Sequence, residues 1–152
     1  MRKIINRIIL IFLNLVVLSG CELLTDKPVA QPEFILIEAT ISDIQSAYDS
    51  GALTSEELVK QYLARINQYD KHGPKINSII TIHPQALKIA AELDAERIKS
   101  GKRGPLHGIP VLLKDNIDTY DLPTSNGSAI LKDVIPQDDA TITQKLREAG
   151  AI

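Results

Sequence analysis

The sequence has 152 residues with 17 basic and 19 acidic side chains, a formal net charge of −2 and a single cysteine. Three of the basic side chains lie within residues 1–20, which hold no acid, so the rest of the chain is distinctly acidic. Phosphate binding needs clustered Lys and Arg, and the sequence has no such cluster, which excludes nucleic acid as an expected partner. The length suits one domain, and the apolar residues are mostly Ile, Leu, Val and Ala, as in helices packed on a sheet.

The first 21 residues have the pattern of an export signal. Met1–Arg7 is basic, Ile8–Leu18 is almost wholly apolar, and the run closes on Leu18-Ser19-Gly20-Cys21. The apolar run is shorter than the roughly 20 residues of a membrane-spanning helix, which favours a cleaved leader. The closing four residues resemble the bacterial lipobox. This resemblance implies cleavage before Cys21, its acylation by fatty acids such as palmitate, and a lipoprotein anchored to a membrane of the bacterial cell envelope.

The alternative for Cys21 is the ordinary role of a lone cysteine as a small buried apolar side chain. We divide the chain into a signal peptide (1–20), a lipidated tether (21–34) and a partial globular domain (35–152). The tether has two prolines and mixed polarity without a period. An irregular N-terminal arm packed on the domain would have the same composition.

The domain begins with two predicted helices. Apolar residues at helical spacing predict a short helix over 40–50, which Gly51 ends. In the next helix, Thr54 and Glu57 form a capping box, in which the hydroxyl and the carboxylate satisfy reciprocal backbone donors. Apolar residues of this second helix fall on one face, namely Leu58, Tyr62, Leu63 and Ile66.

Predicted strands and helices then alternate. Residues 77–82 are β-branched and bounded by turn-forming residues, which predicts a strand. A helix is expected from Pro84 to about Ser100. Residues 109–113 are apolar almost without interruption, as in a strand buried on both faces of a sheet. A last helix ending near Glu148 leads into a strand that begins at Ala151. This alternation predicts an α/β layered fold, of which these strands are only a part.

Lys114 follows the strand predicted over 109–113. The end of a buried strand offers little water, and desolvation favours the neutral amine, which lowers the pKa of a lysine toward the range of a base. A neutral lysine can take a proton from a serine hydroxyl. The alternative is a solvated ammonium that pairs with Asp115 or Asp118. On spacing alone, the solvated ion is favoured.

This part of the sequence contains two runs, Pro105-Leu106-His107-Gly108-Ile109-Pro110 and Lys114-Asp115-Asn116. Together, these two runs are similar to the start of the amidase-signature region. The likeness continues through Leu122-Pro123-Thr124, Asn126-Gly127-Ser128 and Asp139-Ala140-Thr141 to Leu146–Ala151. We therefore interpret the domain as the N-terminal part of that family's layered α/β/α fold with a mixed central sheet, truncated in this chain. The resemblance implies an enzyme that hydrolyses amide bonds or transfers amide nitrogen.

Members of this family use a serine nucleophile, a second serine in a cis peptide and a lysine, without a metal or organic cofactor. The resemblance assigns the lysine to Lys114, which would withdraw a proton through the second serine. Asp115 and Asn116 also match the family pattern and are expected to orient the lysine by hydrogen bonds, although plain turn formation explains them equally well. The resemblance implies that both family serines belong to a Gly/Ser-rich stretch beyond Ile152, which nothing between Cys21 and Ile152 resembles, so the chain alone is predicted to be inactive. Ser125 and Ser128 lie in a polar turn and are interpreted as loop formers.

The histidines suggest no second site. His107 could belong to a Ser-His-Asp triad, but no nucleophile elbow accompanies it. His72 and His83 are interpreted as a loop residue and a residue at a helix start. No pair of histidines has metal-ligand spacing supported by nearby acids.

The leading hypothesis is the first portion of an exported amidase that acts on a small amide and is held at the membrane through Cys21. The alternative from another class is a non-catalytic lipid-anchored binding module or a decayed gene fragment. A transamidase A-subunit-like protein is the weaker alternative. Such an enzyme acts on charged transfer RNA, which requires a cytosolic address and a basic surface, whereas this sequence combines an export signal with an acidic body.

Overall fold

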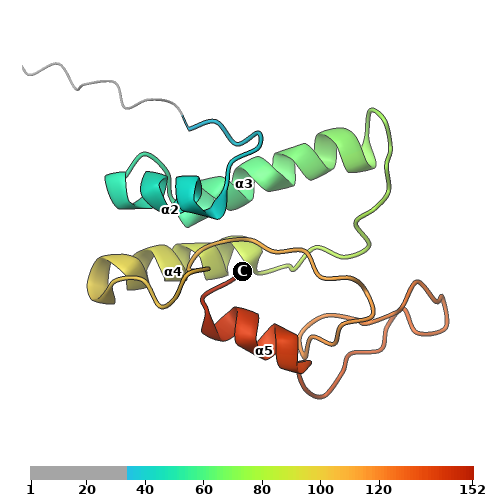
Figure 1. The fold of residues 1–152 in the computed structure, drawn as a ribbon. Helices are drawn as coiled ribbons and strands as arrows, with labels where there is room; N and C mark the ends of the chain where they lie inside the picture. Colours follow the sequence, from blue (N-terminus) through green and yellow to red (C-terminus); the bar gives the residue numbers. More distant parts are fainter. Residues whose placement is uncertain (1–33) are drawn as a thin grey trace, which may run out of the picture. The chain divides into compact units, whose positions relative to one another are not determined.

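The computed structural model of the protein describes residues 34–152. The predicted signal peptide, Cys21 and all but the last residue of the predicted tether lie outside the described residues. The described chain contains five helical elements, shown in Figure 1: α2 (Ile41–Ser50), α3 (Ser55–Arg65), the π-helix η1 (Ile66–Lys71), α4 (Ala86–Ser100) and α5 (Thr141–Glu148). The helices predicted over 40–50, after Thr54, up to Ser100 and up to Glu148 are thereby confirmed.

Both helices at the start of the domain are capped by their own residues. The Thr54 hydroxyl accepts a hydrogen bond from Glu57 N at 3.1 Å, and the Glu57 carboxylate accepts one from Thr54 N at 2.9 Å. This is the capping box predicted from the sequence. Helix α2 has the same arrangement between Thr40 and Asp43, which the sequence analysis did not single out. It ends at Gly51, whose φ of 73° is the left-handed conformation that glycine adopts readily.

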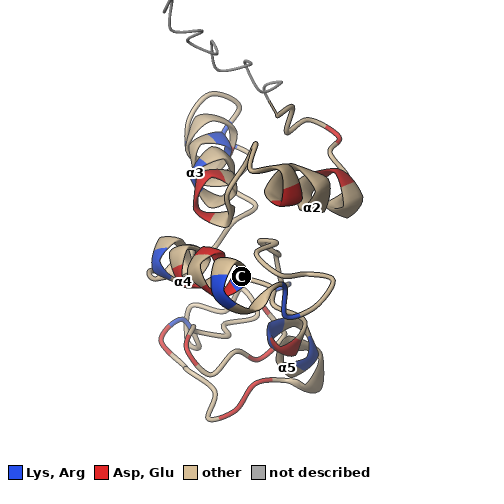
Figure 2. Ribbon diagram, turned by 90° about the vertical axis from the view of Figure 1, so that its left-hand side faces the viewer, with Lys and Arg blue, Asp and Glu red and all other residues tan. Residues whose placement is uncertain are grey.

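Helix α3 is also capped from outside. The carboxylate of Asp94, on α4, accepts hydrogen bonds from Ser55 N at 2.8 Å and Glu56 N at 3.0 Å. These are main-chain donors of the first turn of α3, which have no partner within the helix. The two helices are in contact, and Leu58 of α3 and Leu93 of α4 are buried. Figure 2 shows acidic and basic residues interspersed along α3, α4 and α5.

Residues 105–109 pack against these helices. Ile109 is 6% exposed and belongs to one apolar cluster with Ile44, Tyr48 and Leu58. We call α2, α3, α4 and residues 105–109 the helical platform. It holds most of the buried apolar side chains of the described chain.

The strand predicted over 77–82 is not formed within residues 34–152. The main-chain N–H of Ser78 donates to the carboxylate of Asp70 at 2.6 Å, and that of Ile79 donates to it at 3.4 Å. At the start of this segment, the Asp70 carboxylate at the end of η1 thus accepts the main-chain hydrogen bonds that a neighbouring strand would accept in a sheet. Ile80 and Ile82 are exposed. The β-branched pattern was correctly recognised, but a strand needs a partner that no described segment supplies.

Residues 109–113 form only the beginning of a strand pair. Ile152 N donates to Ile109 O at 3.0 Å and Val111 N donates to Ile152 O at 2.9 Å, so the two segments run in the same direction. The pairing reaches no further than Val111, and no strand is assigned within the described chain. Leu112 is 74% exposed, so the prediction of a strand buried on both faces is wrong. The mixed central sheet is not confirmed.

Candidate functional site

The residues before Lys114 are fixed by a very close approach to α3. Gly108 has a φ of 77°, and a Cβ atom at this position would lie 2.0 Å from the Ser55 hydroxyl oxygen. Only glycine therefore fits here. The Tyr48 hydroxyl donates to Gly108 O at 2.8 Å, and burial raises the pKa of this phenol above its ordinary value. The phenol therefore stays protonated and keeps donating.

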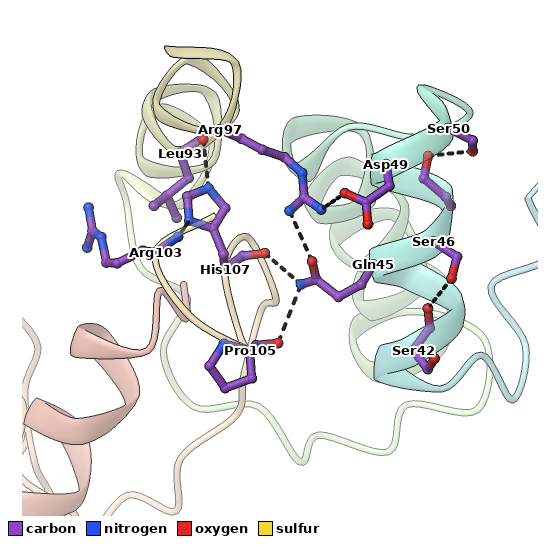
Figure 3. Close-up of polar contacts among 11 residues, drawn as sticks. Ser42, Gln45, Ser46, Asp49, Ser50, Leu93, Arg97, Arg103, Pro105 and His107 are labelled. Carbon is purple, nitrogen blue, oxygen red and sulfur yellow. Dashed lines mark hydrogen bonds and ion pairs between the residues drawn. The ribbon is translucent and has the colours of Figure 1, made fainter. Parts of the chain in front are cut away.

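His107 is fully buried, and both of its ring nitrogens are occupied, as Figure 3 shows. Its Nδ1 lies 3.0 Å from Arg103 N, which can only donate, and its Nε2 lies 2.8 Å from Leu93 O, which can only accept. The proton therefore sits on Nε2. Both ring nitrogens of His107 are thus engaged in holding residues 103–107 against α4.

Gln45 connects the same segment to α2. Its amide nitrogen donates to His107 O at 3.0 Å, and its amide oxygen accepts from Arg97 at 3.0 Å. Arg97 in turn pairs with Asp49 at 2.5 Å (Figure 3). No sequence motif marks these residues, and Gln45 and Asp49 lie about 60 positions from His107, so local patterns do not reveal the contact.

Lys114 lies beyond the platform, at the start of a turn. Its main-chain oxygen accepts a hydrogen bond from Ile117 N at 3.0 Å. Its side chain is exposed and forms no ion pair with any residue of the described chain. Residues 34–152 therefore do not supply the dry surroundings predicted for this amine, and they do not supply the ion pair with Asp115 or Asp118 either. We call residues 110–140 the lysine segment.

Asp115 holds a turn ten residues further along. Its carboxylate accepts hydrogen bonds from Ser125 N at 3.2 Å, from Gly127 N at 3.1 Å and from the Ser125 hydroxyl. Its main-chain oxygen accepts one from Asn126 N at 2.8 Å. The hydroxyl of Ser125, followed by the N–H of Gly127, lowers the pKa of Asp115, so the carboxylate is charged at neutral pH. Asn116 is exposed, and its side chain forms no hydrogen bond within residues 34–152.

The turn at residues 125–128 has the conformation that its sequence suggests. Asn126 and Gly127 have φ angles of 50° and 71°, and Ser128 N donates to Ser125 O at 2.8 Å. Asn-Gly is the usual pair for two successive positive φ angles. Ser128 is a turn residue, as predicted. Ser125 is more than that, because it is 6% exposed and binds Asp115.

A second charged cluster ties the lysine segment to α5. Arg147 pairs with Asp121 at 2.7 Å, and His83 lies 3.0 Å from the other carboxylate oxygen. Burial opposes the charged form of Asp121, but the hydrogen bonds from Arg147 and His83 outweigh it and lower the pKa of Asp121. Arg147 also pairs with Asp139 at 2.9 Å. No group of three or more His, Cys, Asp and Glu side chains in the described residues could hold a metal.

Comparison with known proteins gives the class. The family model described as Amidase matches residues 57–152, which include most of α3, all of α4 and the whole lysine segment. The chain therefore belongs to the amidase family.

Among solved structures, the chain is similar to the native peptide amidase of Stenotrophomonas maltophilia, with 46% identity and a TM-score of 0.74 over 76% of this chain and 24% of that one. An amidase family protein of Bacillus anthracis gives 44% identity and a TM-score of 0.73 over 76% of this chain and 23% of the other. The A subunit of the glutamyl-tRNA(Gln) amidotransferase of Natranaerobius thermophilus is 43% identical over 118 residues, which are 77% of this chain and 23% of that protein.

The chain thus spans about a quarter of the length of these relatives. The amidase part of the sequence prediction is confirmed by these matches. The assignment of Lys114, Asp115 and Asn116 to the site stays a prediction, as does that of Cys21. None of the helices within residues 34–152 has the length and apolar character required to cross a membrane.

Proposed function

We propose that this chain is the N-terminal part of an exported amidase that hydrolyses carbon–nitrogen amide bonds, with Lys114 as the base. The observation that carries the proposal is the position of Lys114. It lies inside the region that matches the amidase family, five residues after Ile109, where the chain leaves the helical platform. Its amine is exposed and unpaired within the described residues, so it is accessible to a reaction partner.

The chemistry follows from a neutral amine. Lys114 would accept, through the second serine in its cis peptide, the proton of the nucleophilic serine, which would attack the amide carbonyl. The C–N bond would break and the nitrogen would leave with a proton, and water would then release the acyl group from the serine. Backbone donors would stabilise the oxyanion. The serines and these donors would come from the three quarters of its relatives' length that this chain does not span. The same part of the protein would cover Lys114, and the removal of water favours the neutral form of an amine.

Asp115 would act here as a support for the lysine. It is the next residue after Lys114, and its carboxylate binds the turn at 125–127, which fixes the main chain beside the lysine. Asn116 would orient the same stretch in the longer protein. No metal or organic cofactor is part of the proposal.

A pair of substitutions tests the role of Lys114. In a longer protein that includes the serine-containing part, we expect Lys114→Ala to lower kcat by about 10²–10⁴-fold, since this is the usual contribution of a general base. Lys114→Arg should be as inactive, because arginine keeps the charge but does not give up its proton. Lys132→Ala, at another exposed lysine of the lysine segment, is the control and should keep full activity. Turnover of peptide amides by the Lys114→Ala protein would disprove the assignment.

The same proposal predicts that residues 21–152 alone do not turn over amides. Peptide amides are the first substrates to test, because a peptide amidase is 46% identical to this chain. Measured turnover by the purified chain would contradict the prediction. If the reading frame stops after codon 152, the non-catalytic lipoprotein or decayed fragment becomes the better interpretation.

The anchor is a separate part of the proposal. We expect Cys21 to carry the lipid and to hold the protein at a membrane of the cell envelope. The substrate would be a small amide. Growth with labelled palmitate should label the wild-type protein and leave Cys21→Ser unlabelled. Label on the Cys21→Ser protein would exclude this site of acylation.

A further inference from the structure

Thr119 and Ser125 are buried polar residues of the lysine segment that the proposed mechanism does not use, and of these two Ser125 binds a charged group next to Lys114. Its side chain is 6% exposed, and its hydroxyl binds the carboxylate of Asp115. The Ser125 N–H binds the other oxygen of the same carboxylate at 3.2 Å. A serine needed only to form the polar turn would not have to be buried against a charged group.

Both oxygens of Asp115 are therefore occupied by the turn. One oxygen accepts from Ser125 N, and the other accepts from the Ser125 hydroxyl and from Gly127 N. Asp115 is adjacent to Lys114 in sequence, yet the two side chains form no ion pair within the described chain. The carboxylate is engaged elsewhere.

This arrangement matters for a lysine that must be neutral in order to work. A carboxylate paired with an ammonium stabilises the charged form and raises the pKa of the lysine. A lysine base next to an unrestrained aspartate would therefore be held in its inactive, protonated form. The other acid close in sequence, Asp118, is exposed and also forms no ion pair with Lys114 within residues 34–152.

We propose that Ser125 is a positioning residue, which holds the Asp115 carboxylate on the turn at 125–127 and away from the Lys114 amine. The Ser125 hydroxyl, which donates to the Asp115 carboxylate, is also the first cause of the lowered pKa of Asp115. The inference rests on the proposed function for its significance, because it matters only if Lys114 is a base. The effect of the Asp115 carboxylate on the Lys114 amine can be measured without any enzyme activity.

The first experiment follows the Lys114 side chain by NMR in the 152-residue protein, with lysine labelled at Cε and the signal assigned through Lys114→Arg. We expect Ser125→Ala to raise the pKa of Lys114 by about 0.2 to 0.7 of a pKa unit, the range that an exposed ion pair with Asp115 would give. Ser125→Thr keeps the hydroxyl and should titrate as wild type. Ser128→Ala, in the same turn but without a contact to Asp115, should also titrate as wild type.

A double substitution shows whether Asp115 transmits the effect. In an Asp115→Asn background, Ser125→Ala should leave the pKa of Lys114 unchanged, since the released group is then uncharged. Asp118→Asn with Ser125→Ala should still show the rise. An unchanged Lys114 titration in the Ser125→Ala single variant would overturn the proposal. So would an equal rise in the Asp115→Asn background, which would indicate a general loosening of the turn.

The second experiment uses the longer enzyme and its pH profile. We expect Ser125→Ala to move the acidic limb of kcat to higher pH, because the amine must lose its proton at a raised pKa. A purely structural loss would lower kcat at all pH values without moving the limb, and that result would exclude the proposed role. An inactive wild-type longer enzyme would defeat the proposed function, while the NMR result on the two side chains would stand.

Discussion

The helical platform and the lysine segment follow each other in the sequence but are stabilised in different ways. The platform buries apolar side chains such as Leu58 and Leu93 and satisfies its helix ends with its own residues. The lysine segment has no helix, exposes apolar residues such as Ile130, and is held by the carboxylates of Asp115 and Asp121. Consecutive stretches of one chain can therefore depend on different interactions, apolar burial in the platform and charged hydrogen bonds in the lysine segment. Matched substitutions in the two regions should therefore differ in their effects.

The largest difference is expected between two glycines with nearly the same φ. In the platform, Gly108→Ala places a Cβ 2.0 Å from the Ser55 oxygen at a φ of 77°, which should cost about 3–5 kcal/mol of unfolding free energy. In the lysine segment, Gly127 has a φ of 71° with nothing within 4 Å of an added Cβ, so Gly127→Ala should cost only about 1–2 kcal/mol. Urea denaturation of both variants measures the difference. Equal losses would mean that the close contact with Ser55 is relieved by movement of α3.

Two leucines give the next largest contrast. Leu58 is 0% exposed, and Leu58→Ala should destabilise the protein by about 2–5 kcal/mol through lost burial and a cavity. Leu112 is 74% exposed, and Leu112→Ala should change stability by less than about 0.5 kcal/mol. Thermal or urea unfolding decides this. A large loss at Leu112 would show that the protein in solution buries a residue that this structure exposes.

A smaller effect is expected at two helix starts. Thr54→Ala removes the side-chain cap of α3 and should cost about 1 kcal/mol. Helix α5 begins after Ala140, which provides no side-chain cap, so Ala140→Ser should add a fraction of this, about 0.5 kcal/mol. Both changes are measured as shifts in the midpoint of urea unfolding. Opposite signs for the two variants are the expected result, and a stabilising Thr54→Ala would argue against the capping box.

The smallest expected effect is a local response to acid. The folded-state pKa of Asp115 lies below its ordinary value of 3.8, so its contribution is fully present above that pH and is lost as the pH falls through the lowered pKa. Because the platform keeps its apolar core in acid, the amide signals of Ser125 and Gly127 should weaken at a higher pH than that of Leu58. NMR spectra recorded between about pH 6 and pH 2 test this order. In an Asp115→Asn protein, the amide signals of Ser125 and Gly127 should no longer weaken at a higher pH than that of Leu58.

The sequence predicted the helices because their signals are local. Spacing of apolar residues, the Thr54–Glu57 pair and the glycines after α2 and α4 all act within a few residues, so they survive whatever surrounds them. The two predicted strands failed for the opposite reason. Residues 77–82 have the composition of a strand, but a strand is completed only by a neighbour, and the described neighbour of 109–113 pairs no further than Val111.

The candidate site divides in the same way. Lys114 was found from its place after an apolar run and from family likeness, both of which are visible in the sequence. Gln45 and Tyr48, which fix the preceding residues, could not be found, because they act across about 60 positions. Ser125 was interpreted as a turn former, since its ten-residue separation from Asp115 carries no pattern.

The cap that α4 places on α3 has a consequence for how the protein acquires its structure. Asp94 lies 39 residues after Ser55, so the first turn of α3 is incomplete until α4 has been synthesised and has docked. Before that, the Thr54–Glu57 box can form, but the N–H groups of Ser55 and Glu56 lack the partner that α4 supplies. The two helices should become protected against hydrogen exchange in a single step, and the polypeptide that follows them meets a support that is already assembled.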